Sequence, residues 1–312
     1  MQPALRKHLA KRSDAVSLAV VLAHLAFVAT PLYLAAIVGP SWLLVPLWIW
    51  FGVGMHGLLN LMHETAHNHV FRRRWACELL GGWLLGPLTL ADFEVYRQRH
   101  WRHHRHLGVE GDTKDAYLID VRGAGMLRFL GRCLTLREAA AKFRSTRGTG
   151  DQDAARSPAA WLPRVVVVQV ALAASLLLTA LVARDGELGA SVIAAACAWA
   201  IYAYGIASLT LFVASLRTIA EHQIGDDGAT VVGRAALRNF ACGPLGRLVF
   251  GCYGFAEHAT HHLEPAIPSY RLRAATEELI AEGDRSLAPR AGYVATLAAL
   301  AARTPERRAA LG

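Results

Sequence analysis

Residues 15–62 read AVSLAVVLAHLAFVATPLYLAAIVGPSWLLVPLWIWFGVGMHGLLNLM, and these 48 positions contain no Asp, Glu, Lys or Arg. A helix needs about 20 consecutive apolar residues to cross the hydrocarbon core of a bilayer. The stretch is therefore long enough for two spans, and Gly39-Pro40-Ser41 near its middle predicts a tight turn between them. We place these spans at Ala15–Gly39 and Ser41–Met62.

Two later runs have the same character, Trp161–Ala183 and Leu188–Leu216, and only four residues separate them. The whole chain of 312 residues is 54% hydrophobic and 18% charged, with a mean hydropathy of +0.29. A soluble domain carries about 25% charged residues. The composition excludes a disordered chain, a collagen-like chain and a small disulfide scaffold. It predicts an all-α integral membrane protein with four transmembrane helices in two hairpins.

The basic residues predict the orientation of these hairpins. The net charge is +9, and Lys and Arg avoid every long apolar run. Positive residues lie before the first span and after the second, at Arg6, Lys7, Lys11, Arg12, Arg72, Arg73 and Arg74, whereas Arg184 alone lies on the opposite side. The positive-inside rule then places both termini and both large polar segments in the cytoplasm. The Ala-rich and Arg-rich composition suggests a bacterial cytoplasmic membrane, and the charge pattern favours membrane topology over nucleic-acid binding.

We expect one membrane domain over residues 1–312, with no second soluble domain. Its successive parts are a cytoplasmic tail (1–14), a transmembrane hairpin (15–62), a cytoplasmic and interfacial segment (63–160), a second hairpin (161–216) and a cytoplasmic segment (217–312). Two shorter apolar stretches, Leu79–Leu90 and Phe240–Phe255, are interrupted by Gly and Pro and predict re-entrant or interfacial helices. Segment Arg144–Ala159 predicts a flexible loop, and the residues after Pro265 predict helix.

Fourteen histidines are present, and eleven of them fall in four short clusters next to the expected cytoplasmic ends of the spans or interfacial segments. His63 and His67 are four residues apart, so on a helix they share one face. The pattern His-x2-His-His occurs twice, beginning at His100 and at His258. On a helix this spacing places the first histidine within one turn of the two later ones.

Such a pattern is typical of metal binding, because neutral imidazole is the commonest nitrogen ligand in proteins. Three or four ligands satisfy a zinc ion, so nine clustered histidines suit two metals. Ligand type alone leaves iron, copper, nickel and zinc open. The candidate ligands are His63, His67, His100, His103, His104, His222, His258, His261 and His262. The five cysteines form no CxxC pair, so we expect reduced thiols and no metal site built from cysteine.

These motifs resemble the three histidine boxes of the membrane fatty acid desaturase, hydroxylase and carotenoid ketolase superfamily. The surrounding residues are most similar to those of fatty acid desaturases. The similar segments are Tyr96-Arg97-x2-His100, Gly111-Asp112-Thr113-Lys114-Asp115, His261–Leu272 with its Pro-x-Ile-Pro-x-Tyr run, and Leu216–His222, which resembles the segment that supplies one further ligand. In that last segment Thr218 stands where stearoyl-type desaturases carry Asn.

The resemblance implies a di-iron centre in a cytoplasmic, histidine-lined cap over four spans, with the nine histidines divided between the irons. It implies O2 as co-substrate and an oxidoreductase that desaturates a fatty acyl or lipid chain by removing hydrogen from C–H bonds. No His-Pro-Gly-Gly motif typical of cytochrome b5 is present. The electrons are therefore expected from a separate donor, such as a ferredoxin, a rubredoxin or a cytochrome b5-like protein.

Other functions fit part of the pattern. A hydroxylase or ketolase of a lipid or carotenoid is the nearest alternative, because the histidine boxes do not distinguish the reactions. A metal transporter or sensor is a distant one, because transporters place their ligands near the middle of the membrane, whereas these histidines lie beyond the ends of the spans. A zinc hydrolase is equally distant.

Polar residues close to the boxes are candidates for supporting the ligands. A carboxylate that accepts the second imidazole N–H fixes the orientation of a ligating ring, and a solvated surface carboxylate is the alternative for each of the glutamates. The candidates for this supporting role are His69, His106, Glu64, Glu221, Glu257, Asp112 and Asp115. His56, two turns before His63, is expected to be a buried histidine or to line a substrate path. We interpret the run Arg72-Arg73-Arg74 first as a determinant of membrane topology. The secondary hypothesis is that it forms a basic docking site for an acidic electron carrier.

Overall fold

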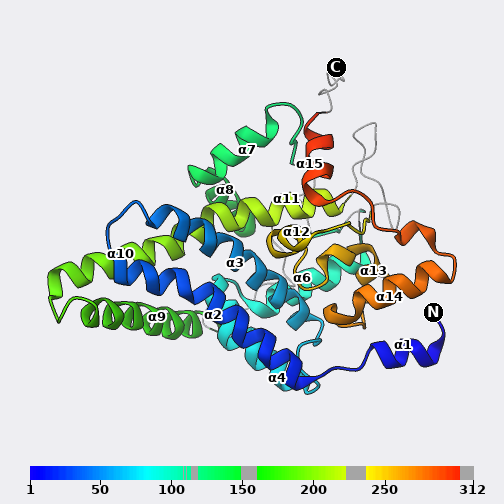
Figure 1. The fold of residues 1–312 in the computed structure, drawn as a ribbon, viewed down its shortest axis with the longest axis horizontal. Helices are drawn as coiled ribbons and strands as arrows, with labels where there is room; N and C mark the ends of the chain where they lie inside the picture. Colours follow the sequence, from blue (N-terminus) through cyan, green and yellow to red (C-terminus); the bar gives the residue numbers. More distant parts are fainter. Residues whose placement is uncertain (108, 110, 114–118, 149–159, 223–236, 303–312) are drawn as a thin grey trace.

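The computed structural model describes residues 1–107, 109, 111–113, 119–148, 160–222 and 237–302, and it has no β-strand in these ranges (Figure 1). Within this described part of the chain, four helices are long and apolar enough to cross a membrane. They are α2 (Asp14–Val38), α3 (Leu44–Ala66), α9 (Leu162–Val182) and a continuous helix Leu188–Glu221. The last comprises α10 (Leu188–Gly205), the π-helical turn η5 (Ile206–Thr210) and α11 (Leu211–Glu221). The predicted all-α fold with four spans is confirmed.

The turns of the two hairpins meet at one end of the bundle, on the left in Figure 1. Gly39 ends α2 with a φ of +70°, a backbone conformation that glycine adopts readily. The guanidinium of Arg184, from the turn of the second hairpin, donates hydrogen bonds to the carbonyl oxygens of Ala36 at 2.9 Å and Ile37 at 3.0 Å. These carbonyls belong to the last turn of α2, where helix geometry leaves acceptors without partners.

Small residues let the helices of the bundle approach closely. A Cβ atom on Gly52 of α3 would lie 2.7 Å from a methyl carbon of Leu209, and one on Gly205 would lie 2.6 Å from the ring of Phe51. Larger side chains would therefore push α3 away from the π-helical turn, which is the packing role that glycine has between membrane helices. The main core lies between α2, α3 and α10, and it includes Met55 and Tyr202.

Apolar side chains also cover the outside of the bundle. Only 17% of the 18 most apolar consecutive residues of α9 are buried inside the protein. Val166, Val167, Val170 and Leu178 are more than half exposed. A lipid environment accommodates such a surface, and water does not. The chain is accordingly an integral membrane protein.

Between the hairpins, α4 (Arg74–Leu79), η1 (Leu80–Leu85) and α5 (Gly86–Thr89) follow one another and pack beside α3 and α9. The predicted helix Leu79–Leu90 lies within this part of the chain. Two further helices, α7 (Gly125–Leu134) and α8 (Arg137–Gly148), precede the second hairpin. The predicted loop Arg144–Ala159 is wrong for residues 144–148, which continue α8 from a run of three alanines that favours helix. Residues 149–159 lie outside the described residues.

The C-terminal part consists of short helices. They are α12 (Pro244–Val249), η7 (Phe255–Glu257), α13 (His258–Leu263), α14 (Ser269–Ala281), η8 (Arg285–Leu287) and α15 (Tyr293–Ala301). The predicted helix after Pro265 is confirmed for α14 and α15, and residues 303–312 lie outside the described residues. The predicted helix over Phe240–Phe255 is wrong for most of this stretch, because only α12 and the first residue of η7 are helical there. The chain then turns at Tyr253 and Gly254, whose φ angles are +54° and +75°. The N-terminal helix α1 (Pro3–Leu9) contacts α14.

Candidate metal centre

Four helices bring nine histidines together at the end of the bundle opposite the hairpin turns. A five-histidine group takes its members from α3, from α6 (Phe93–Arg105) and from α13, and a second group uses α6, α13 and the end of α11. Within each group, one potential ligand atom per residue lies within 4.8 Å of the others. The five-histidine group is His63, His67, His100, His104 and His261; the second group is His103, His222 and His262, and His222 also groups with His258 and Glu221. These are the nine histidines singled out in the sequence.

Helical spacing explains why histidines of one box fall into different groups. Residues four apart lie on one face of a helix, and a residue three after the first points to one side of it. His100 and His104 accordingly join one group, and His103 between them joins the other. Box three (His258, His261 and His262) follows the same rule, since His261 belongs to the first group and His262 to the second, whereas His258 groups with His222 and Glu221.

The start of α6 is fixed by its N-cap, which sets the rotation of the helix. The carboxylate of Asp92 accepts hydrogen bonds from the backbone N–H groups of Glu94 at 2.8 Å and Val95 at 3.2 Å. Box three is positioned by Asn239, which is buried. Its side-chain oxygen accepts from the N–H groups of Ala259 and Thr260 at the start of α13. Asn239 was missed in the sequence, because it lies nearly twenty residues before the box it holds and belongs to no local motif.

The ring nitrogens are close enough to share metal ions. The Nε2 atoms of His67 and His100 lie 2.6 Å apart, those of His100 and His104 3.0 Å, and those of His103 and His222 3.3 Å. Two nitrogens bound to one metal ion at about 2.1 Å and at a right angle are separated by about 3 Å. The buried Nε2 of His262 has no hydrogen-bond partner among the residues that the structure describes. The residues present therefore fit metal ions.

Burial also favours the ligating form of His262. Desolvation holds the pKa of this imidazole well below its ordinary value, and the neighbouring imidazoles, His104 foremost, lower it further. The ring is consequently neutral at physiological pH, which is the state that donates a lone pair to a metal.

Two histidines of the second group are oriented through their Nδ1 atoms. The Nδ1–H of His103 donates to the carboxylate of Asp112 at 2.7 Å, and that of His222 donates to the backbone oxygen of Thr218 at 2.9 Å. In both rings the Nε2 atom is thereby directed to the group. This arrangement fixes the tautomer and the ring orientation of a metal-ligating histidine.

Removing the Asp112 carboxylate should weaken metal binding. In Asp112→Asn the amide oxygen still accepts the Nδ1–H bond of His103 but carries no negative charge. We expect the affinity for a divalent metal to fall about 10-fold to 100-fold. The measurement is a competition titration of the purified chain with a chelator of known affinity. Asp120→Asn, whose carboxylate pairs with the neighbouring Arg122, is the matched control. Equal losses in both variants would contradict the assigned role of Asp112.

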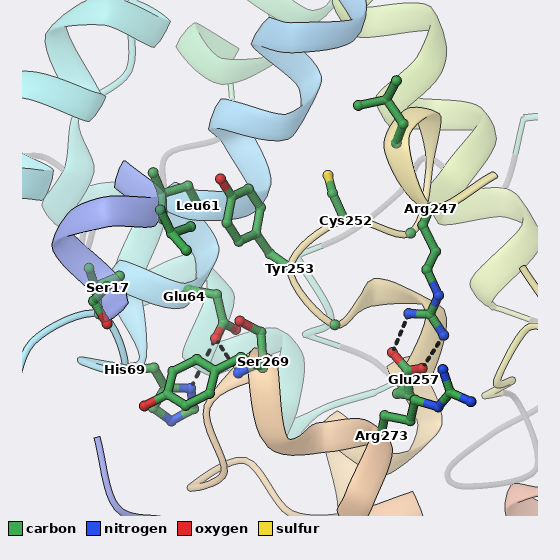
Figure 2. A pocket seen from close by; sticks show the side chains of 16 residues that line it. Ser17, Leu61, Glu64, His69, Arg247, Cys252, Tyr253, Glu257, Ser269 and Arg273 are labelled. Carbon is green, nitrogen blue, oxygen red and sulfur yellow. Dashed lines mark hydrogen bonds and ion pairs between the residues drawn. The ribbon is translucent and has the colours of Figure 1, made fainter. Parts of the chain in front are cut away.

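Glu64 connects α3 to the start of α14. Its Oε2 accepts a hydrogen bond from the backbone N–H of Ser269 at 2.9 Å and lies 3.5 Å from the Nδ1 of His69 (Figure 2). Its Oε1 lies 3.5 Å from the Nδ1 of His63. His69 is buried and stacks on His67 at 5.1 Å between ring centroids. Both residues therefore contact the five-histidine group without being among its members.

Glu221 is fully buried beside the second group. Its carboxylate lies 3.1 Å from the guanidinium of Arg217, accepts a hydrogen bond from the hydroxyl of Tyr293 at 2.9 Å and lies 3.7 Å from the Nε2 of His258. Burial, followed by the charge of Glu221, raises the pKa of Tyr293 well above its ordinary value, so the hydroxyl keeps its proton. Tyr293 lies in the C-terminal helix, where the sequence carries no motif.

The remaining supporting candidates lie elsewhere. The carboxylate of Glu257 pairs with the guanidinium of Arg247 at 2.7 Å (Figure 2). His106 is exposed, its Nδ1–H donates to the backbone oxygen of Arg102 at the end of α6, and it belongs to neither group. Asp115 lies outside the described residues. His56 is fully buried within α3.

A cavity of about 690 Å³ lies beside Glu64 and His69, the two residues that contact the five-histidine group (Figure 2). Glu64 and His69 lie on its wall, and the other residues come from α2, α3, α12, α14, Val70 and residues 251–257. Apolar side chains line one part, and the Arg247–Glu257 pair lies in another. Ligand cavities in proteins typically measure about 300–1,000 Å³. The apolar lining comes from Val20, Leu61, Val70, Leu248 and Tyr253.

Comparison with known proteins agrees with these features. The family model described as fatty acid desaturase matches residues 40–293, which include all nine histidines and three of the four spans. The chain belongs to the fatty acid desaturase family.

Two curated proteins resemble this desaturase-family chain over short segments. An sn-1 oleoyl-lipid 12-desaturase of Anabaena variabilis is 33% identical over 66 residues, which are 21% of this chain and 19% of that relative. A protein of the same name from Synechocystis sp. is 32% identical over 74 residues, which are 24% of this chain and 21% of that relative. The matched segments thus span about a fifth of the length of each relative.

Proposed function

We propose that this chain is an O2-dependent desaturase that introduces a double bond into the aliphatic chain of a membrane lipid. The observation that carries the proposal is the pair of histidine groups in a member of the fatty acid desaturase family. We assign one iron ion to the five-histidine group and a second to His103, His222, His258 and His262, with Glu221 as a neighbouring carboxylate. When bound, the two irons supply the redox chemistry that activates O2 for removal of hydrogen from an unactivated C–H bond.

Electron balance requires a reductant. The reaction converts –CH2–CH2–, O2, two electrons and two protons into –CH=CH– and two molecules of water. The substrate supplies two of the four electrons that reduce O2 to water, so a separate donor must supply the other two. The side chains described above would hold and orient the irons, and the burial of seven of the nine histidines would keep bulk water away from them.

The cavity beside Glu64 suits the substrate. Its apolar side chains would hold the hydrocarbon, and its charged end, with Arg247 and Glu257, would face the polar head group. Val20 and Leu248 are partly exposed on the outer surface, so a lipid could reach the cavity from the membrane. We further propose that the histidine end of the bundle faces the cytoplasm, because the basic residues before α2 and after α3 lie at that end.

Mass spectrometry of lipids from a host that expresses the chain tests this function. We expect a species about 2 Da lighter than its precursor, formed in air and absent under nitrogen, because desaturation removes two hydrogens. A gain of about 16 Da would instead support a hydroxylase, and a gain of about 14 Da a ketolase. Full activity without O2, or purified chain that contains no iron, would contradict the proposal.

A further inference from the structure

Helix α6 carries a row of arginines and one tryptophan beside the face that holds its histidines. Arg97, Trp101 and Arg105 follow one another at intervals of four residues, and Gln98 and Arg102 form the neighbouring row. Together with Asn68 and Arg74 these side chains line a cleft of about 470 Å³. We call these seven residues the arginine cleft. His100 and His103, from the adjoining face of α6, are buried.

The cleft is basic. Four of its seven residues are arginines, and none is acidic. Glu78 and Glu94 pair with Arg74 and Arg97 next to the cleft, whereas the side chain of Arg105 is exposed. Arg72 and Arg73 continue the positive charge just before α4. Such a concentration of one sign of charge attracts an acidic partner and accelerates its association.

Trp101 joins this cleft to the histidines. Its ring lies 4.7 Å from that of His67 and 5.6 Å from that of His104, measured between centroids. Both histidines belong to the five-histidine group. A protein seated in the cleft would therefore be separated from this group by one aromatic side chain.

We propose that the arginine cleft is the docking surface of an acidic one-electron carrier protein, and that electrons pass by Trp101 to the five-histidine group. The inference rests on the proposed function, whose electron balance needs two electrons per double bond. Two reduced carriers would each lose one electron and leave oxidised, and those electrons complete the reduction of O2 to water. Arginine is enriched at protein interfaces. The interfaces between electron-transfer partners are typically small, so a cleft of this size suits such a partner.

Anionic lipid head groups are the other occupant that arginines attract. The contact between Trp101 and two histidines favours the carrier, because a site for head groups needs no connection to the redox centre. The two occupants give different results in the following experiment.

The test measures binding, which does not depend on turnover. The iron-loaded full chain is placed in nanodiscs made only of phosphatidylcholine, and the probe is an oxidised, acidic [2Fe–2S] ferredoxin in biolayer interferometry. We expect saturable binding that weakens steeply as salt is raised. Absence of binding at low salt, or binding that salt does not change, would overturn the proposal.

Charge reversal locates the surface. We expect Arg102→Glu/Arg105→Glu to weaken ferredoxin binding about 10-fold or more, and Arg105→Glu alone to weaken it in the same direction. Arg128→Glu, an exposed residue of α7, is the matched control and should change the affinity less than about 2-fold. Equal weakening in the control would overturn the assignment. Loss of binding to anionic vesicles with unchanged ferredoxin binding would identify a lipid surface instead.

A third measurement separates this inference from the proposed function. Turnover is followed with reduced ferredoxin and, separately, with dithionite and methyl viologen, a small donor that needs no docking surface. We expect Arg105→Glu to lose rate with ferredoxin and to retain it with the small donor. Product formation that falls equally with both donors would overturn the docking role. If wild type forms no product with either donor, the proposed function fails, while the binding result still decides the docking surface.

Discussion

Replacing His103 with alanine is expected to abolish lipid oxidation and to lower the iron content of the purified chain. His103 lies 3.3 Å from His222 through its Nε2 atom, and its Nδ1–H is held by Asp112. The substitution removes one nitrogen of the second group and leaves a buried space beside the others. We expect iron to fall from about two to about one per chain. The measurements are inductively coupled plasma mass spectrometry of the protein and mass spectrometry of the host lipids.

His106→Ala is the control for this variant. It makes the same change in the same box, three residues later, at an exposed position outside both groups. We expect normal iron content and normal product. Wild-type iron and product in His103→Ala would contradict the assignment of the second group.

Arg217→Ala is expected to lower the free energy of unfolding by about 3–5 kcal/mol. The side chains of Arg217 and Glu221 are 9% and 0% exposed, and they lie 3.1 Å apart one helical turn from each other. Truncation leaves the carboxylate of Glu221 buried without its cation, which costs far more than the loss of an exposed pair. It also removes the guanidinium from the face of Phe255, 3.8 Å from the ring centroid. Unfolding by a denaturing detergent, followed by circular dichroism, provides the measurement.

The exposed pair Arg74–Glu78 has the same helical spacing and provides the comparison. There, Arg74→Ala should cost about 0.3–0.5 kcal/mol. A loss in Arg217→Ala as small as this would show that the burial of the pair does not decide its contribution.

The spans could be predicted from the sequence to within a few residues, because hydropathy and length alone define them. The errors lie where polar residues are buried in protein. Span two was ended at Met62, yet α3 continues to Ala66, since His63 and Glu64 face the histidine group instead of water. Span four was likewise predicted to end at Leu216, before the charged residue Arg217. Its helix continues to Glu221, because Arg217 and Glu221 are buried in the protein.

The candidate ligands could be named from spacing, but their surroundings could not. Helical periodicity is local, so the division of His100 and His104 from His103 was already implicit in the box. Asn239, Tyr293 and Trp101 act through contacts with residues that are distant in sequence or on another helix, and single-sequence patterns do not contain such contacts. Glu257 shows the converse, because its position beside His258 suggested support for that ring, whereas its carboxylate pairs with Arg247.

The wide spacing of the histidines along the chain has a consequence for biosynthesis. Each histidine group contains a member from α13, so neither can be assembled before box three has been translated. At about 5–20 residues per second, the ribosome needs about 10–40 s to proceed from His67 to His262. During this time the first hairpin must already reside in the bilayer with its histidines unmetallated. With these histidines as ligands, iron loading is a post-translational event, and cells starved of iron would accumulate an inserted apoprotein that awaits metal.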